Sequence, residues 1–550
     1  MKRVWRLPIL LLIAALSVTA IAAQNRIGAG NRSNVRLNEM VPTAAAGDAL
    51  SSTWYCAAGT ATGVVAGDTA GFAEQTLTIS NASSNDASGS VTAYTESGVT
   101  AVKSVTVGAH GQTTLRVSDI LKAAWASALV EVSGGGITVT HELRGPAGRS
   151  ISACASSPGD NWYFPSGTTR AGSRNLLSLF NPFPGEATVD VSFDTEDGAR
   201  TPQQLQGMVV PGGRVVKVDV GAIVTLRERV STTVHARIGR VIAEQIQTGD
   251  GRTNTEQGLT AVLGATAVAP IWTFPVATAA STSAREIVSV MNMGDADTEV
   301  QVEIQLDDPA TNGSVEPFVV QVASHRSAQI DLAIDPRIPK SVGRWLIVRS
   351  GSGVPIVAER SIGATRGASV GGFAFSMGVP IAATSWLGTV SSATDVSTTL
   401  IAVANPSGSQ TATVTISLHS KGSVTAIVTA KSVRIAPGQR LVLSLTSAIV
   451  GKTDASVEVE SDRPVVVGQW MTVTTPFEIQ TISDFPVIGT ESLLANVFTP
   501  DQAVAAVTAV RSDDTVVPET TTTTAAVTTT TIAGATTTTI AGAATTTTLR

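Results

Sequence analysis

One local pattern recurs along this chain about every 110 residues, and it constrains the fold more than any other feature. Each copy begins with a tryptophan, continues through a stretch rich in Gly, Ser, Thr and Ala, and reaches an apolar run that ends at asparagine. The tryptophans are Trp54, Trp162, Trp272 and Trp386, and the asparagines are Asn81, Asn181, Asn292 and Asn405. A period of this length predicts one small domain per copy, repeated four times in tandem.

Each copy also carries the pattern of short antiparallel strands. After the asparagine, turn residues precede a strand in which apolar and polar residues alternate. The apolar positions are Val189, Val191 and Phe193, then Val300, Val302, Ile304 and Leu306, then Val414, Ile416 and Leu418. About seven short strands per copy are typical of an immunoglobulin-like or fibronectin-like β-sandwich. The predicted fold class is therefore all-β, with one short helix expected at 118–126.

Two further features recur in every copy. A second turn ends at Gln112, Arg214, Arg326 and Arg440, and a late strand carries Glu142, Glu244, Glu359 and Gln469. Equivalent residues in every copy favour a structural role, in which the tryptophans and these polar residues hold the unit or its junction together. For the tryptophans, an exposed platform that stacks on a glycan is the alternative.

These patterns divide the chain into segments. Four β-sandwich repeats are predicted at 51–155, 156–268, 269–382 and 383–490, named repeat 1 to repeat 4 below. Residues 28–50 form a linker. Residues 491–550 are rich in threonine and are predicted to be a disordered tail. The tail is either an O-glycosylated or wall-threading stalk, or a segment without function whose sequence drifts genetically.

The N-terminal segment, 1–27, has the features of an export signal. Lys2, Arg3 and Arg6 precede an uncharged apolar run, and Ala20 and Ala22 suit cleavage by a signal peptidase. A cleaved signal peptide and a retained membrane anchor both remain open. Either kind of segment places the repeats outside the cytoplasm: in the medium, in the cell wall or on the membrane. Contact with the membrane is expected only if the N-terminal segment is uncleaved.

The chain has two cysteines, Cys56 and Cys154. In an oxidising compartment they predict a disulfide that closes repeat 1, while two buried free thiols are the alternative. Repeats 2 and 3 carry Phe164 and Phe274 at the place of Cys56.

The residues around these landmarks resemble a known family. The Trp-Tyr-Cys sequence at Cys56, the Asn-Trp-Tyr-Phe sequence at Trp162, the Leu-Phe-Asn-Pro-Phe-Pro turn at Asn181 and the threonine-rich end carry the resemblance. The chain is similar to an uncharacterised family of exported, envelope-associated actinobacterial proteins, the domain of unknown function numbered 5719. The resemblance covers residues 50 to 490. It implies a cell-envelope setting and supplies no catalytic residue.

Motifs for catalysis, cofactors and metals are not found in the sequence, so we expect no enzyme activity, no cofactor and no metal. The five histidines are interpreted as surface or turn residues: His110, His141, His235, His325 and His419. Acidic clusters around Asp194, Asp250, Asp295 and Asp307 are interpreted as solvated strand faces, with Ca²⁺ binding as the alternative. A net charge of -6 without a basic stripe argues against nucleic acid as a partner.

The sequence therefore predicts an exported structural or binding protein of the cell envelope. We expect the four sandwiches to form a rod, or a bent or closed assembly because the linkers are short. The alternative is a carbohydrate-binding accessory of cell-wall assembly, with its site on repeat 1 near Trp54 and the insertion at 63–71; an exported hydrolase is less favoured. The expected partners are cell-wall glycan or other envelope proteins.

Overall fold

The computed structural model describes a set of segments between residues 40 and 509. These are 40–63, 72–251, 257–277, 284–333, 335–339, 342–351, 353–364, 370–390, 396–445, 448, 455–475, 490–494, 498–500 and 508–509. All of them belong to one compact unit, Met1–Asp514. The predicted export signal and the threonine clusters from Thr520 onward lie outside the described residues.

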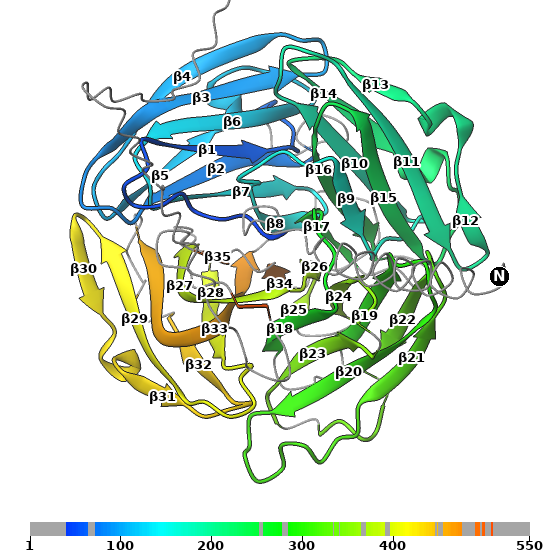
Figure 1. Ribbon diagram of the computed structural model, residues 1–550. Helices are drawn as coiled ribbons and strands as arrows, with labels where there is room; N and C mark the ends of the chain where they lie inside the picture. The colour runs from blue at the N-terminus through cyan, green and yellow to red at the C-terminus, as the bar shows by residue number, and fades with distance from the viewer. Residues whose placement is uncertain are drawn as a thin grey trace, which may run out of the picture. The chain divides into compact units, whose positions relative to one another are not determined.

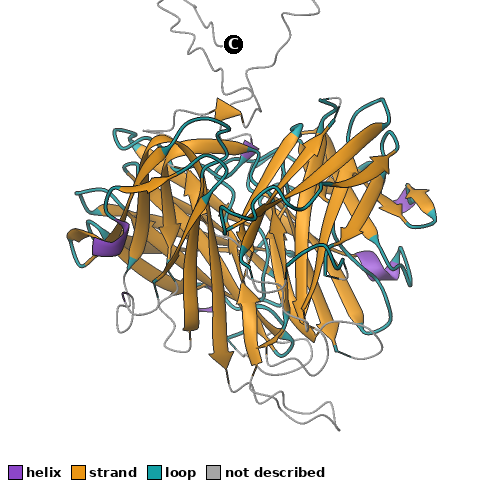
Figure 2. Cartoon of the chain, turned by 90° about the horizontal axis from the view of Figure 1, so that it is seen from below, coloured by secondary structure: helices purple, strands orange, loops and turns teal. Residues whose placement is uncertain are grey.

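Strands account for nearly all of the regular structure, as Figure 2 shows. The predicted all-β class is confirmed, and all but one of the strand pairs are antiparallel, the exception being β25 (Val370–Gly371) with β34 (Thr490–Leu494). The predicted helix at 118–126 is wrong. One 3-10 turn, η1 (Val117–Asp119), occupies its start, and Ala126 already begins a strand.

Each of the four predicted ranges contains, wholly or in large part, at least seven of the described strands. Repeat 1 contains β1 (Ser51–Cys56), β2 (Glu74–Asn81), β3 (Ala87–Thr95), β4 (Thr100–Val107), β5 (Gly111–Arg116), β6 (Ala126–Ser133), β7 (Ile137–Gly145) and β8 (Gly148–Ala153). Repeat 2 contains β9 (Asn161–Phe164), β10 (Ser173–Asn181), β11 (Ala187–Thr195), β12 (Gly198–Arg200), β13 (Met208–Val210), β14 (Arg214–Asp219), β15 (Val230–Ile238), β16 (Ile242–Asp250) and β17 (Gln257–Leu263).

Repeat 3 contains β18 (Ile271–Ala277), β19 (Ala284–Asn292), β20 (Thr298–Leu306), β21 (Phe318–Val322), β22 (Ser327–Asp331), β23 (Arg344–Ser350), β24 (Ile356–Ala364), β25 and β26 (Phe373–Met377). Repeat 4 contains β27 (Ile381–Thr389), β28 (Val396–Ala404), β29 (Ala412–Ser420), β30 (Ser423–Ala426), β31 (Val433–Ile435), β32 (Arg440–Ser444) and β33 (Ser456–Thr475). β34, β35 (Phe498–Pro500) and β36 (Thr508–Ala509) lie past residue 490, so strands continue into the range predicted as tail.

The same strand order recurs in each range. In repeat 1 one sheet has the order β1-β6-β3-β4 and the other has β5-β2-β7-β8, and repeats 2 and 3 pair their corresponding strands in the same way. In repeat 4 the long β33 supplies the sixth strand with its first half and the seventh with its second half, which joins the two sheets. This order differs from the ABED and CFG sheets of an immunoglobulin constant domain, so the likeness to that fold is limited to two facing antiparallel sheets.

The alternating pattern of the third strands explains how the two sheets pack. All of the predicted apolar positions on β11, β20 and β29 are buried, at 5% exposure or less, while most of the polar residues between them are partly exposed. Successive side chains on a strand point to opposite faces, so one face of each sheet enters a core. The predicted two-faced strands are therefore confirmed.

The repeats contact one another in a closed cycle. The strands paired with β7, β16, β24 and β33 make the inner contacts: β8 with β17, β17 with β26, β26 with β34, and β34 with β8. Figure 1 shows these four strands in the middle of the ribbon. Repeats 1 and 4 also share hydrogen bonds, from Gln112 Nε2 to the Val390 carbonyl and between the hydroxyls of Thr140 and Thr389. A rod would hold these repeats apart, so the expectation of a rod is wrong and that of a closed assembly is correct.

Candidate functional site

The disulfide predicted for repeat 1 is present. Cys56 ends β1 and Cys154 follows β8, 98 residues later, with 4.6 Å between their Cα atoms. Reciprocal backbone hydrogen bonds of 2.8 Å between Tyr55 and Ala155 hold the two segments side by side. The bond joins the first and last strands of repeat 1, and both cysteines are buried in its core.

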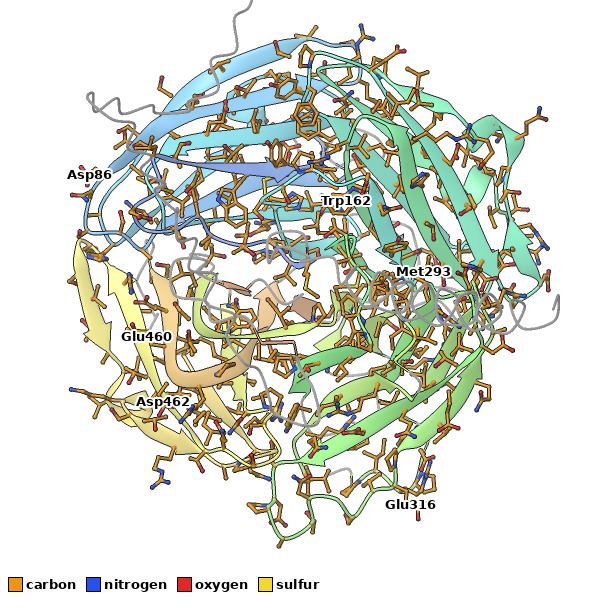
Figure 3. The ribbon with its side chains drawn as sticks, viewed as in Figure 1. Asp86, Trp162, Met293, Glu316, Glu460 and Asp462 are labelled. Carbon is orange, nitrogen blue, oxygen red and sulfur yellow. A yellow bond between two sulfur atoms is a disulfide. The ribbon has the colours of Figure 1, made fainter. Side chains whose placement is uncertain are left out.

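The four tryptophans lie in the cores. Each is only 1% exposed, and Figure 3 shows Trp162 among the strands of repeat 2. The indole Nε1 of Trp162 donates to the Val241 carbonyl at 3.0 Å, and the indoles of Trp272 and Trp386 donate to Ile356 and Val465 at 2.8 and 2.9 Å. These carbonyls lie just before β16, at the start of β24 and in the middle of β33, which are the strands that correspond to β7. Each of these three indoles therefore ties the first strand of its repeat to that strand. The alternative of an exposed stacking platform at Trp54 is wrong, because a glycan cannot reach a buried ring.

The four asparagines clamp a turn. In repeat 2 the Asn181 Oδ1 accepts from the Phe183 amide at 3.0 Å, and its Nδ2 donates to the carbonyls of Gly185 and Val210 at 2.8 and 3.0 Å. The same three kinds of contact recur at Asn81, Asn292 and Asn405. A short amide side chain can satisfy donors and acceptors on both sides of a turn at once, which explains its presence in every copy.

In three of the four repeats, the last residue of the second turn contacts the preceding repeat. Arg326 Nε binds the Asp194 Oδ1 of repeat 2 at 2.6 Å, and Arg440 binds both carboxylate oxygens of Asp307 in repeat 3 at 2.6 and 2.8 Å. Gln112 reaches repeat 4 as described above. The sequence revealed these turns, but it did not reveal that they join repeats.

These contacts correct the interpretation of the acidic clusters. Asp194 is buried, and it also accepts two hydrogen bonds from Ser327, at 2.8 Å from the amide and 2.5 Å from the hydroxyl. Asp307 has Arg440 as its bidentate partner. Both carboxylates therefore belong to junctions between repeats and not to solvated strand faces. Asp295 is exposed, as predicted.

Two adjacent residues on β7, and on the corresponding strands β16, β24 and the second half of β33, lie at the junctions between repeats, and we call them the junction pair. In repeats 1, 2 and 3 at least one residue of the pair contacts a neighbouring repeat. The two residues lie opposite the positions three and four residues before the repeat's asparagine. The four junction pairs are Thr140 and His141, Glu244 and Gln245, Glu359 and Arg360, and Gly468 and Gln469. The sequence predicts that Glu142, Glu244, Glu359 and Gln469 are equivalent, and this is wrong for Glu142 and Gln469. Glu244 and Glu359 lie opposite the residue three positions before the asparagine. Glu142 lies two residues beyond that position, and Gln469 lies one residue beyond it.

The junction pairs of repeats 1 and 2 meet in a buried polar contact. His141 Nε2 lies 2.7 Å from the Glu244 Oε1, and its Nδ1 lies 2.9 Å from the Gln75 Nε2. The two side chains are 0% and 1% exposed. Because solvent and substrate cannot reach them, this His-Glu contact serves the junction.

Between repeats 2 and 3 a buried carboxylate takes the corresponding place. The Glu359 Oε2 accepts from the Ser166 amide at 2.8 Å, while Gln245 donates to the Ser166 carbonyl at 3.0 Å. Glu359 is fully buried, and this burial raises the pKa of its carboxyl from 4.5 to about 8. At neutral pH Glu359 is therefore mainly protonated, which lowers the cost of holding it between the repeats.

The histidines also differ from the sequence interpretation. His235 and His325 are exposed, as predicted, but His141 and His419 are buried. His419 Nε2 lies 2.9 Å from Glu458, and its Nδ1 lies 3.3 Å from the Nδ1 of half-buried His110. Residues 309 positions apart in the chain meet here because repeat 4 closes onto repeat 1.

The insertion of repeat 1 is described only at its edges, since residues 64–71 lie outside the described residues. At its start, Glu74 accepts from the amides of Thr62 and Gly63 at 3.0 and 2.7 Å. A buried carboxylate thus fixes the base of the insertion. Among the described residues no cluster of three or more His, Cys, Asp or Glu is arranged to hold a metal ion. Within the same part of the chain, no helix has the length and apolar character to cross a membrane.

Part of the chain matches a known protein family. A model described as "Family of unknown function (DUF5719)" matches residues 137–385. Over these residues the chain is similar to that family. The resemblance noted in the sequence is thus confirmed over that stretch, which runs from the seventh strand of repeat 1 to the start of repeat 4. No curated protein matches the chain.

Solved structures give little further information. A crystal structure of Thermotoga maritima 1070 shares 20% identity over 20% of this chain and 92% of its own, with a TM-score of 0.17. A tetra-tandem repeat from the extending region of a large adhesion protein shares 13% identity over 81% and 98%, with a TM-score of 0.09. E. coli alpha-2-macroglobulin shares 10% identity over 78% and 29%, with a TM-score of 0.10. Scores this low carry no argument about fold or function.

Proposed function

We propose that this chain is an exported, non-enzymatic scaffold of the cell envelope, in which four tandem β-sandwich repeats form a closed assembly that presents its outer loops and strands to partners. The observation that carries the proposal is the repetition of junction contacts. Three repeats use the last residue of the second turn to contact a neighbouring repeat, and three use a side chain of the junction pair. The recurring tryptophans and asparagines stabilise the core and the turn of each repeat.

The location outside the cytoplasm rests on the disulfide and on the N-terminal sequence. A Cys56–Cys154 bond persists in oxidising compartments, and cytosolic reductants keep such pairs reduced. The basic and apolar segment at 1–27 supplies an export signal or an anchor. The threonine-rich composition of the C-terminal sequence fits the same setting, because such sequences form glycosylated or wall-threading stalks.

The alternative function is binding of a cell-wall glycan by stacking on Trp54. The Trp54 ring is buried, so it cannot serve as that stacking surface. We therefore favour a protein partner. Apolar residues are exposed on the surface of repeat 2, where Phe183, Val209 and Ile238 are 40%, 46% and 63% exposed.

The test combines location with capture. In intact native cells, we expect a membrane-impermeant protease to remove the chain and a thiol label to react only after reduction. Crosslinking in the same cells, followed by mass spectrometry, should recover envelope proteins. Full protease protection together with free thiols at Cys56 and Cys154 would refute the proposed location, and recovery of wall glycan without protein would favour the carbohydrate-binding alternative.

A further inference from the structure

Three apolar side chains are exposed together at one end of repeat 2, and we call them the apolar patch. Val209 on β13 and Ile238 at the end of β15 both pair with Thr188 of β11, so they lie on either side of it across the sheet. Phe183 lies in the turn between β10 and β11, and it lines a groove together with Gly239, the residue after Ile238. Each of the three side chains is at least 40% exposed. Figure 1 shows β11 and β13 at the outer edge of the ribbon.

The other three repeats have no apolar residue at the positions that correspond to this patch. The first position is the residue whose amide binds the repeat's asparagine. The second pairs with the second residue of the third strand, and the third lies two residues beyond the partner of that strand's third residue. The residues at these positions are Ser83, Thr106 and Gly134 in repeat 1, Gly294, Gln321 and Ser352 in repeat 3, and Ser407, Arg434 and Arg463 in repeat 4.

The comparison among repeats shows that the sandwich does not need apolar side chains at these positions. Three copies of the same unit fold with polar residues or glycine there, so packing within repeat 2 does not explain the patch. A contiguous apolar patch on a soluble surface indicates that the surface binds another molecule.

Two charged residues lie beside the apolar patch. The groove has a volume of about 300 Å³, and its lining includes Glu186 in the turn after β10 and Arg240 in the turn after β15. The two turns are in contact, since a Cβ atom on Gly239 would lie 3.3 Å from the Glu186 carbonyl oxygen. Both charged side chains are exposed, and neither forms a hydrogen bond or an ion pair with the described part of the chain. The surface therefore offers one unpaired acid and one unpaired base next to an apolar centre.

Such a surface is complementary to itself. When two copies meet about a two-fold axis through the groove, each Glu186 faces the partner's Arg240, and the apolar side chains of one copy pack against those of the other. Exposed ion pairs contribute little affinity, so the apolar side chains supply most of the binding energy. The charges determine how the two copies are oriented and which partner is accepted.

We propose that the apolar patch of Phe183, Val209 and Ile238 is the contact surface of a homodimer, and that a second copy of this chain is its protein partner. This inference rests on the proposed function in one respect, the binding of a protein at this surface. It requires neither export nor a wall location. The patch is small, so the dimer should form at roughly micromolar concentrations and dissociate on dilution.

The first test is sedimentation velocity of the full chain at concentrations from about 1 to about 100 µM. We expect a reversible equilibrium between monomer and dimer for the wild type. The double variant Phe183→Ser with Val209→Thr carries the residues that repeat 1 has at these positions, so the fold tolerates them. Its dissociation constant should rise at least about tenfold. The control Val102→Thr, which changes a 65% exposed valine of repeat 1, should dimerise as the wild type does. Every protein keeps residues 1–27, so association through that segment is common to all.

An exchange of the two charges distinguishes a second copy from any other partner. Glu186→Arg alone brings arginines together across the axis, and Arg240→Glu alone brings carboxylates together, so each variant should dimerise about tenfold more weakly than the wild type. An equal mixture of the two variants should dimerise again, because every contact across the axis then joins opposite charges.

The proposal is overturned if the wild type stays monomeric up to about 100 µM, or if the patch and charge variants associate as the wild type does. Crosslinking of a different protein to the patch of a chain that stays monomeric would overturn it as well. None of these results depends on location, so the protease and thiol tests of the scaffold function succeed or fail separately.

Discussion

The pH dependence of stability provides the sharpest test of the junction between repeats 2 and 3. Burial raises the pKa of Glu359 to about 8, against 4.5 for the free side chain. Between these values the folded protein holds a proton that the unfolded chain has released. The stability is therefore fully present below pH 4.5, falls as the pH rises, and levels off above about pH 8.

The size of the effect follows from the same two values. Each pH unit between 4.5 and about 8 removes about 1.4 kcal/mol, so the total loss is roughly 5 kcal/mol, as an order of magnitude. The variant Glu359→Gln keeps the shape of the protonated acid and cannot ionise. We expect it to match the wild type near pH 5 and to exceed it in stability at pH 8.5.

The assay is urea unfolding of both proteins from pH 4.5 to 9, and the relevant quantity is the difference between their free energies of unfolding. Subtraction removes the contribution of groups that titrate identically in both. Glu299→Gln, which removes a half-exposed carboxylate from the same repeat, controls for the loss of one acidic group. A difference between Glu359→Gln and the wild type that does not change with pH would refute the reasoning.

Three further predictions concern the disulfide, the turn clamp and a junction ion pair. Replacing both Cys56 and Cys154 by serine should destabilise repeat 1 by at most about 4 to 5 kcal/mol, because the bond closes a 98-residue loop. Hydrogen exchange should rise in β1 and β8 and, through the contacts with Thr389 and Val390, at the edge of repeat 4. Unchanged exchange would contradict this prediction. Asn181→Ala removes a donor and an acceptor that satisfy buried backbone groups, so the unfolding free energy should fall by about 2 kcal/mol. The control Asn161→Ala, on the exposed side of β9, should change it by less than about 0.5 kcal/mol. Arg326→Met leaves the buried Asp194 without its cation and should lower the free energy of unfolding in urea by about 3 kcal/mol. Adding Asp194→Asn should restore part of this loss. Equal stability of Arg326→Met and the wild type would count against a role of this ion pair in the junction.

The repeat unit could be predicted from the sequence because its signals are local. The alternation along Val189, Val191 and Phe193 depends only on the two-residue period of a strand, so it identifies a half-buried strand without knowledge of its neighbours. The recurring tryptophan and asparagine mark equivalent places in each copy, and the compartment favours a bond between two lone cysteines. Helix prediction failed at 118–126, where packing against β2 leaves one 3-10 turn before β6 begins.

The contacts between repeats were decided by the tertiary structure. His110 and His419 are 309 residues apart, and no sequence spacing predicts that repeat 4 closes onto repeat 1 and brings them to 3.3 Å. Asp194 and Asp307 look like solvated residues beside alternating strands, and only the approach of Arg326 and Arg440 from the next repeat buries or pairs them. A strand's period determines which side of a sheet a residue faces, but a residue becomes a junction residue only when another repeat covers that side, and this depends on how the folded repeats pack.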